Sequence, residues 1–165
     1  MTVLITGGHS PRTFKLLKAF PGNQIVLGGY GEMPSMQTDE YRLVSLGKFL
    51  PDALAHQLLQ SCLDYDADAI LPVLAEEILA VAQAAVLFDE FGITVLLPVD
   101  AESYLPAVDL PATNWSVWMN GQPVAAVPEL SEAQFDLGRS LKLQGAFQLD
   151  PQERFTLFTV SANGL

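Results

Sequence analysis

The sequence is poor in positive charge. Its 165 residues include eight Lys or Arg against 19 Asp or Glu, which gives a net charge of −11. From Phe49 to Gly138 there is no Lys or Arg, while fourteen acidic residues fall there. Nucleic-acid binding needs cationic side chains that neutralise phosphates, so this distribution argues against DNA or RNA as a partner. If a small anionic ligand binds, the N-terminal helix, with its basic residues, is the expected place.

Cysteine and long apolar runs are also scarce. The single Cys62 excludes an internal disulfide and a cysteine metal cluster, and its position on an apolar helix face does not suggest a nucleophile. No uninterrupted apolar run reaches the ~18 residues that a membrane span needs. The N-terminus has no basic segment followed by a cleavage-site pattern. We therefore expect a cytoplasmic protein with no membrane contact.

Apolar residues, by contrast, are abundant. Half of the residues are hydrophobic and 16% are charged, against a typical ~25% charged. The mean hydropathy is +0.28. Either both faces of a sheet are covered within the chain, or apolar surface meets another chain. A homodimer is therefore one of the arrangements that the composition leaves open.

The first residues have the pattern of a nucleotide-binding α/β layer. A short aliphatic strand, Thr2–Ile5, is followed by Gly7-Gly8 and then by a helix from Pro11 to about Phe20. Ser10 stands at the N-cap position, and Pro11 fills the first helical position, where a missing N–H costs nothing. The sequence thus predicts a strand, a glycine turn and a helix N-terminus.

Strands and helices alternate up to about residue 98. Further strands are expected at 24–27, 42–46, 69–73 and 93–97, and helices at 51–64 and 75–91. The strands are aliphatic rather than alternating, which is typical of a parallel sheet covered on both faces. The predicted fold class is therefore α/β, a three-layer Rossmann-like parallel sheet of about five strands in a domain spanning residues 1–98.

The remaining residues differ in kind. Residues 99–113, rich in proline, are predicted to be a connector, and residues 114–165 a small β-β-α-β extension packed on the first part. Asn120-Gly121 between two apolar runs is a strong hairpin signal. Ser131 with Gln134 resembles a capping box, which predicts a helix to about Leu143. A last strand is expected from Arg154 to Val160.

The hairpin carries both tryptophans. Pairing across its turn is predicted to set Val117 opposite Val124, Trp115 opposite Ala126 and Trp118 opposite Pro123. Trp115 and Trp118 should project to opposite faces, so that one enters the core. The other must be covered by the last strand or by a partner chain, which makes the two tryptophans candidate interface residues.

Gly7-Gly8 allows two interpretations. Backbone N–H groups and the helix dipole could receive an anion, or the glycines could merely permit a tight turn. Arg12 or Thr13 stands where a G-x-G-x-x-G pattern needs its third glycine. The second strand ends in Gly28-Gly29, where dinucleotide-binding proteins need an acidic residue for the ribose. Support for a dinucleotide is therefore weak; no cofactor is required by the sequence, and a nucleotide remains an alternative.

The other candidates also have ordinary explanations. His9 could donate to a ligand or simply be solvated in its loop. Arg12, with Lys15 and Lys18, could form a basic rim or only the polar face of the first helix. Glu76 and Glu77 begin a helix, where the dipole favours acids, and follow a central strand, where α/β sheets bind ligands. We predict no catalytic residue; the candidate ligand-binding residues are Gly7, Gly8, His9, Ser10, Arg12, Glu76 and Glu77.

Three segments together resemble a known family: Thr6–Arg12, Tyr41–Val44, and Asp68–Pro72 with Glu76-Glu77. The first 98 residues are similar to the N-terminal, pre-ATP-grasp domain of ATP-grasp carboxylate–amine ligases. In that family the opening strand, T-G-x-x-S-P-R turn and helix are followed by a strand ending in P-T/S-x-E-E. The resemblance implies a Rossmann-like fold and a ligand contact by one of the two glutamates.

The departures from that family matter as much. About 67 residues follow Pro98, with three basic residues and no glycine-rich phosphate loop. Val73-Leu74-Ala75 replaces the usual hydroxyl or carboxyl residue, so a substrate contact is expected to be lost. We therefore expect a stand-alone module, non-catalytic alone, that binds a small molecule or a protein. The alternatives are a nucleotide- or NAD(P)-binding Rossmann-type enzyme and an accessory subunit of a separately encoded ATP-grasp ligase.

Overall fold

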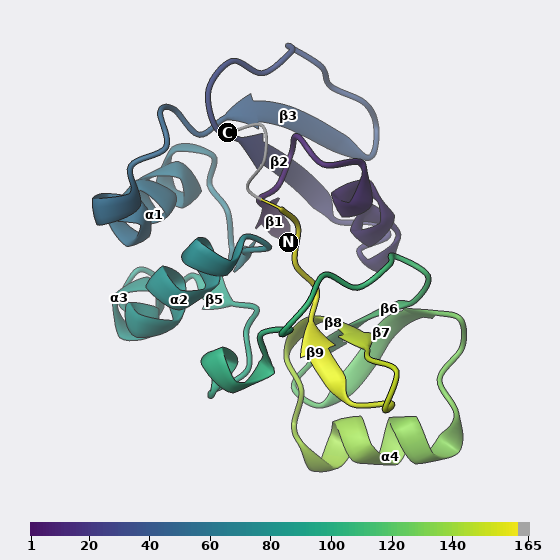
Figure 1. Ribbon diagram of the computed structural model, residues 1–165. Coiled ribbons are helices and arrows are strands. Elements are labelled where there is room, and N and C mark those ends of the chain that lie inside the picture. The colour runs from purple at the N-terminus through teal and green to yellow at the C-terminus, as the bar shows by residue number, and fades with distance from the viewer. Residues whose placement is uncertain (162–165) are drawn as a thin grey trace.

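Five parallel strands form the central sheet of the computed structural model, which describes residues 1–161 (Figure 1). Their order in the sheet is β3-β2-β1-β4-β5. The strands are β1 (Thr2–Ile5), β2 (Gln24–Gly29), β3 (Tyr41–Ser45), β4 (Ala69–Leu71) and β5 (Thr94–Val95). All four pairings are parallel, and β1 and β4 are almost wholly buried. The predicted Rossmann-like α/β fold is confirmed.

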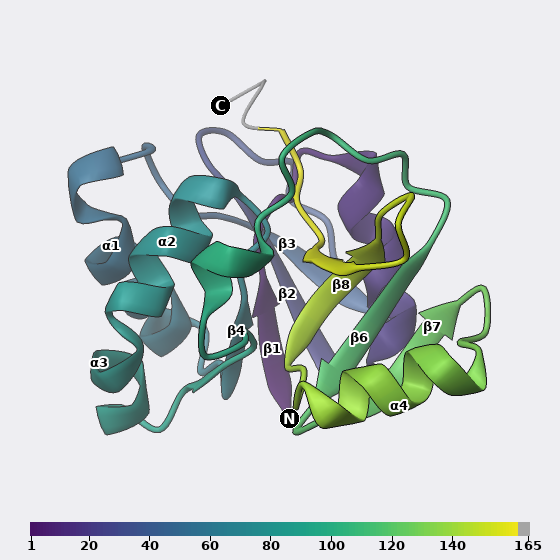
Figure 2. The ribbon, with the colours of Figure 1, turned by 60° about the horizontal axis from the view of Figure 1, so that its bottom comes forward.

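Different structures cover the two faces of this sheet (Figure 2). One face is covered by α1 (Leu54–Asp64), α2 (Ala75–Gln83) and α3 (Ala85–Glu90), with the short turn η2 (Pro51–Ala53) leading into α1. The other face carries the 3₁₀ helix η1 (Pro11–Ala19) and a second sheet. From β1 the chain adds β2 and then β3 on one side of the sheet. After β3 it returns and adds β4 and β5 on the other side of β1. The crevice between β1 and β4 is therefore the topological switch point, where open α/β sheets bind ligands.

The C-terminal part is an antiparallel sheet with strand order β7-β6-β8-β9. Its elements are β6 (Trp115–Met119), β7 (Gln122–Val127), α4 (Glu132–Ser140), β8 (Gly145–Leu149) and β9 (Phe155–Leu157). The predicted β-β-α-β order lacks one strand. Two strands follow α4, and the first of them, β8, lies in the middle of the sheet and pairs with both β6 and β9. The predicted last strand is also too long at both ends. The capping box of Ser131 and Gln134 is confirmed.

The hairpin register differs from the predicted one. A bulge between Val117 and Trp118 places Trp115 opposite Val127 and Val117 opposite Ala125. Only the predicted pairing of Trp118 with Pro123 holds. Counting outward from the turn fails because the bulge adds one residue to one strand.

Two helices also depart from expectation. The first is a 3₁₀ helix over nine residues rather than an α-helix. The helix expected over 75–91 is divided at Ala84 into α2 and α3. Neither glycine nor proline stands at the break, so composition gives no signal for it. No helix within residues 1–161 has the length and apolarity needed to span a membrane.

Both tryptophans are buried by the chain itself. Trp115 is 5% exposed and Trp118 is fully buried. The Trp118 ring packs edge-to-face on Phe155, and its Nε1 donates to the hydroxyl of Ser116 at 2.9 Å. Of the two predicted alternatives, cover by the chain itself or by a partner, the structure shows the first: both side chains are buried within the chain, and β9 and α4 pack on Trp118.

Polar side chains tie the connector to both sheets. Arg12 donates to Leu110 O at 2.7 Å and to the side-chain oxygen of Gln148 at 3.1 Å. Gln148, which is buried in β8, donates in turn to Pro111 O at 2.9 Å and to Asn114 O at 3.1 Å. The connector, which includes the turn η3 (Ala101–Tyr104), is thus held by the first helix and the second sheet together.

Candidate functional site

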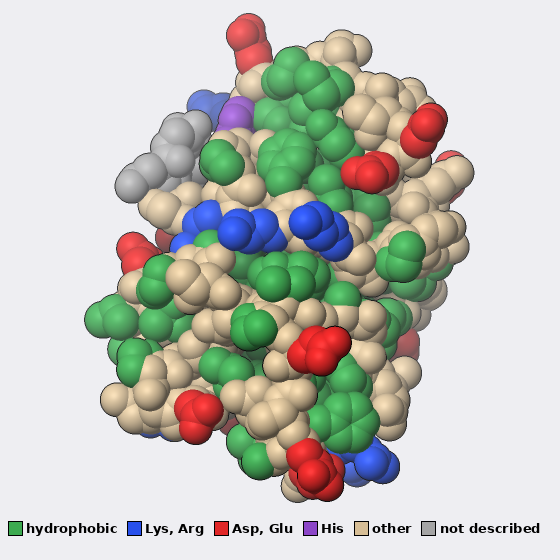
Figure 3. All heavy atoms as spheres, turned by 90° about the vertical axis from the view of Figure 1, so that its right-hand side faces the viewer, with side chains coloured by type: hydrophobic (Ala, Val, Ile, Leu, Met, Phe, Trp, Pro, Cys, Tyr) green, Lys and Arg blue, Asp and Glu red, His purple; other side chains and the backbone are tan. Residues whose placement is uncertain are grey.

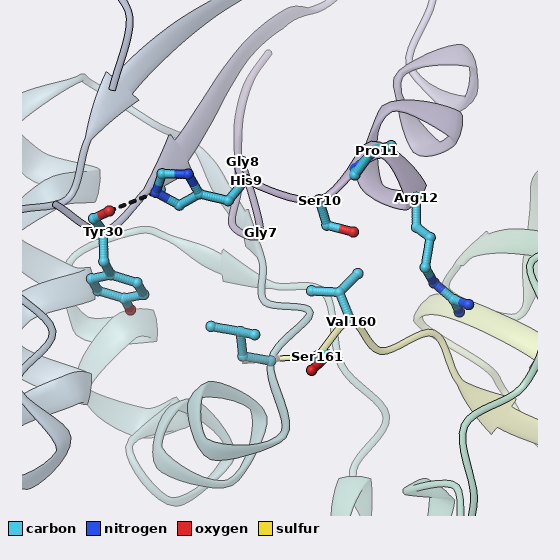
Figure 4. A pocket seen from close by; sticks show the side chains of 11 residues that line it. Gly7, Gly8, His9, Ser10, Pro11, Arg12, Tyr30, Val160 and Ser161 are labelled. Atoms are coloured by element: carbon cyan, nitrogen blue, oxygen red, sulfur yellow. Dashed lines mark hydrogen bonds between the residues drawn. The ribbon is translucent and has the colours of Figure 1, made fainter. Parts of the chain in front are cut away.

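A pocket of about 220 Å³ lies at the carboxyl ends of β1 and β2, beside the loop that follows β4 (Figure 4). This is the switch-point crevice. Its volume corresponds to about seven water molecules at liquid density. It lies below the ~300–1,000 Å³ typical of pockets for drug-sized ligands. The space therefore suits a small molecule.

The structure brings most of the predicted site residues together. The pocket is lined by Gly7, Gly8, His9, Ser10, Pro11, Arg12, Gly29, Tyr30, Leu74, Val160 and Ser161. Five of the seven predicted residues are in this set, four from the loop after β1 and Arg12 from the first turn of η1. The two glutamates are not: Glu76 is exposed on α2, and Glu77 is buried behind the pocket. None of the lining side chains is acidic.

The glycine turn is explained by packing. The Gly8 N–H donates to Gly28 O at 2.9 Å, and the Ser10 N–H donates to Gly7 O at 3.0 Å. Gly7 has φ +72°, and a Cβ there would lie 2.5 Å from Val73 Cγ2. The Gly8 N–H is therefore already bonded to β2 and the Ser10 N–H within the turn. Of the two interpretations left open for Gly7-Gly8, these bonds favour the tight turn, because the Gly8 N–H is not free to receive an anion.

His9 and Ser10 supply the available polar side chains. His9 Nε2 lies 2.6 Å from Tyr30 O. A carbonyl only accepts, so Nε2 carries the hydrogen, and Nδ1 is the acceptor of a neutral ring. Ser10 occupies the N-cap position of η1, but its hydroxyl does not cap the helix, contrary to expectation. Among the described residues neither Nδ1 nor this hydroxyl has a hydrogen-bond partner.

Arg12 serves the connector as well as the pocket wall. Its guanidinium extends away from His9 and Tyr30 (Figure 4) and, besides its bonds to Leu110 and Gln148, donates to Thr159 O at 3.2 Å. It also stacks over the Phe158 ring, with 5.2 Å from Cζ to the ring centroid. Its Nε is buried without a partner among residues 1–161. Arg12 thus contributes positive charge to the pocket while most of its donors hold the chain together.

Glu77 forms a buried network behind the pocket. Its carboxylate accepts from the Thr6 hydroxyl at 2.5 Å, the Tyr30 hydroxyl at 2.7 Å and the Leu74 N–H at 3.1 Å. Thr6 Oγ1 accepts from the Val73 N–H at 2.9 Å. The ends of β1, β2 and β4 are therefore joined through one carboxylate.

Burial dominates the protonation of this network. It raises the pKa of Glu77 above its ordinary value, while the hydrogen bonds from Thr6, Tyr30 and the backbone act in the opposite direction. Burial, and then the neighbouring Glu77, raise the pKa of Tyr30. The tyrosine is consequently a neutral donor.

The network also caps α2. The Leu74 side chain has no acceptor, but Glu77 is the third residue of α2 and its carboxylate reaches back to the Leu74 N–H. The ligand contact expected of one glutamate is thus replaced, for Glu77, by a structural role. Sequence reasoning missed Thr6 and Tyr30, whose only signal is a polar residue directly after each of two apolar strands.

Other chemistry is limited in the described part of the chain. Burial raises the pKa of the Cys62 thiol to about 12, which disfavours its thiolate. Within residues 1–161 no three His, Cys, Asp or Glu side chains lie together as a metal site.

No known protein-family model matches the sequence, and a search of curated proteins gives no significant match. The resemblance to pre-ATP-grasp domains therefore stays a prediction, and any function is argued from the site.

Proposed function

We propose that the chain is a pre-ATP-grasp-like module, non-catalytic alone, that binds a small anion such as a monocarboxylate. The observation that carries the proposal is the pocket at the switch point between β1 and β4. Its residues match such a ligand: Arg12 supplies positive charge, and the Ser10 hydroxyl is unbonded among described residues.

Size and hydrogen bonding favour a small ligand over a dinucleotide. A volume of about 220 Å³ accommodates a short carboxylate or an inorganic anion. Binding a pyrophosphate on the glycine turn would require backbone N–H groups, and the Gly8 N–H is bonded to Gly28 O. The anion is therefore expected to be held by side chains rather than by the turn.

Isothermal titration of the full chain with sodium acetate and with sodium phosphate at pH 7 tests the proposal, with sodium chloride at equal ionic strength as the reference. Ser10→Ala removes a hydroxyl that supports no described hydrogen bond. We expect it to weaken anion binding by about tenfold or more, as for the loss of one bond to a charged group. Ser140→Ala, at an exposed site on α4, is the matched control and should bind like the unmodified chain.

Failure of acetate and phosphate to bind at millimolar concentration would contradict the proposal. Equal affinities in Ser10→Ala and Ser140→Ala would show that the anion sits elsewhere. A nucleotide or NAD(P) retained through purification would instead favour the alternative of a Rossmann-type enzyme.

A further inference from the structure

The segment from Phe158 to Ser161 crosses the end of the central sheet after leaving β9. Figure 1 shows it in yellow, running from the second sheet toward the ends of the parallel strands. The Phe158 N–H donates to Ala146 O and the Val160 N–H to Val73 O, both at 2.9 Å. The segment is therefore fixed at one end to β8 and at the other to the loop after β4.

Val160 lies at the boundary between two spaces. Together with Ser161 it lines both the 220 Å³ pocket and a hollow of about 590 Å³ beside connector residues 105–109. Its side chain points toward the loop after β1 (Figure 4), and its Cγ2 lies 3.2 Å from where a Cβ on Gly7 would be. The residue is only 7% exposed. A buried side chain thus contributes to the wall that the small pocket shares with its larger neighbour.

The charge of the two spaces differs. The pocket is lined by the cationic Arg12 and by no acidic side chain, whereas the neighbouring hollow is lined by Glu76 and Asp109. A ligand long enough to reach both would therefore match them best with a carboxylate at one end and an amine at the other.

We propose that Val160 is the specificity-determining residue of the pocket, restricting it to short anions by blocking the way to the acidic hollow. This inference rests on the proposed function, since it concerns the ligand of that same site. The addition or loss of one methylene in an apolar wall changes discrimination between ligands by about tenfold or more. Shortening Val160 should accordingly admit an ω-amino acid and leave the recognition of acetate in place.

Titrations of the full-length chain with acetate, 5-aminopentanoate and glutarate test the inference. In Val160→Ala, 5-aminopentanoate should bind about tenfold more tightly than in the unmodified chain, whereas acetate should change by less than about threefold. Glutarate should gain less, because its second carboxylate would face Glu76 and Asp109. Val81→Ala is the matched control, since it removes the same atoms from a buried valine of α2 that does not line the pocket.

The outcomes separate the two proposals. If acetate binds and the preference between 5-aminopentanoate and acetate is the same in Val160→Ala as in the unmodified chain, the inference is overturned and the proposed function stands. If neither the unmodified chain nor Val160→Ala binds any of the three ligands, both the proposed function and the inference are overturned. If only Val160→Ala binds, and binds only 5-aminopentanoate, the result supports the role of Val160 and contradicts the proposed ligand. If Val160→Ala does not fold, Val160→Ile decides: an added methylene should weaken acetate, and an unchanged affinity overturns the inference.

Discussion

Tyr30→Phe removes one hydroxyl from the network that joins the ends of three strands. In the structure that hydroxyl donates to the buried carboxylate of Glu77 at 2.7 Å. Hydrogen bonds to charged groups contribute about 1.5–3 kcal/mol, and the oxygen left behind has no other donor among the described residues. We expect the free energy of unfolding to fall by about that amount. In a chain of this size the melting temperature should fall by about 3–12 °C.

The penalty should depend on pH. The pKa of Glu77 is raised by burial, and the Tyr30 hydroxyl is one of the groups that lower it. Its loss should therefore raise that pKa further. Stability linked to a raised carboxyl pKa is fully present below the unfolded value and is lost as pH rises through the folded value. The cost of Tyr30→Phe should accordingly grow with pH, as Glu77 changes from a protonated to an ionised acceptor.

Urea unfolding of the variant between pH 4.5 and 9 measures both effects. Tyr104→Phe is the matched control, because the Tyr104 ring packs on Phe147 and its hydroxyl makes no hydrogen bond with a described residue. A cost of Tyr30→Phe below about 0.5 kcal/mol, or equal to that of the control at every pH, would refute the reasoning, since ordinary surface substitutions fall in that range.

Two further predictions concern the same core. In Glu77→Gln the side chain cannot ionise, so the free energy of unfolding should decline less steeply with rising pH than in the unmodified chain. The two slopes should differ by at most about 1.4 kcal/mol per pH unit. Urea midpoints of the two chains that change in parallel from pH 5 to 9 would contradict this. Gly138→Ala places a Cβ against the Trp118 ring and should cost about 1–3 kcal/mol, with a change in the near-ultraviolet tryptophan signal; Ser140→Ala, on the same helix, should show neither effect.

The parallel sheet could be predicted because its strands are apolar on both faces. Val3, Leu4 and Ile5 are all fully buried. In a small α/β chain, a short continuous apolar run is typical of a parallel strand that is covered on both faces. The strand β8 could not be predicted in the same way. It begins with Gly145 and Ala146, and the buried side chain of Gln148 bonds the connector, so its sequence shows neither an aliphatic run nor alternation.

The site was predicted where it is local in sequence and missed where it is not. The loop from Gly7 to Arg12 is contiguous, so its residues could be named together. Glu77 could be named only as a candidate ligand contact. Its partners Thr6 and Tyr30 lie 71 and 47 residues away, and only the order β2-β1-β4 in the sheet brings the three side chains together.

The 3₁₀ form of the first helix has a signal in the sequence that an α-helical wheel hides. From Pro11 to Phe20 the residue types repeat every three positions. The buried members are Thr13, Leu16 and Ala19, and the basic ones are Arg12, Lys15 and Lys18. A helix with three residues per turn aligns each set in one row along its axis. Figure 3 shows a row of Lys and Arg side chains across the face of the molecule that carries this helix.

That row also explains why the tighter helix fits the connector. Arg12 donates to Leu110 O at 2.7 Å and Lys15 to Ala112 O at 3.1 Å, so donors three residues apart meet carbonyls two residues apart. One 3₁₀ turn rises about 6 Å, and two residues of extended chain span at most about 7 Å. In an α-helix the same three residues would rise only about 4.5 Å and would not complete a turn, so the two side chains would no longer lie in one row along the axis. The connector therefore favours the 3₁₀ form, which aligns both donors with its carbonyls.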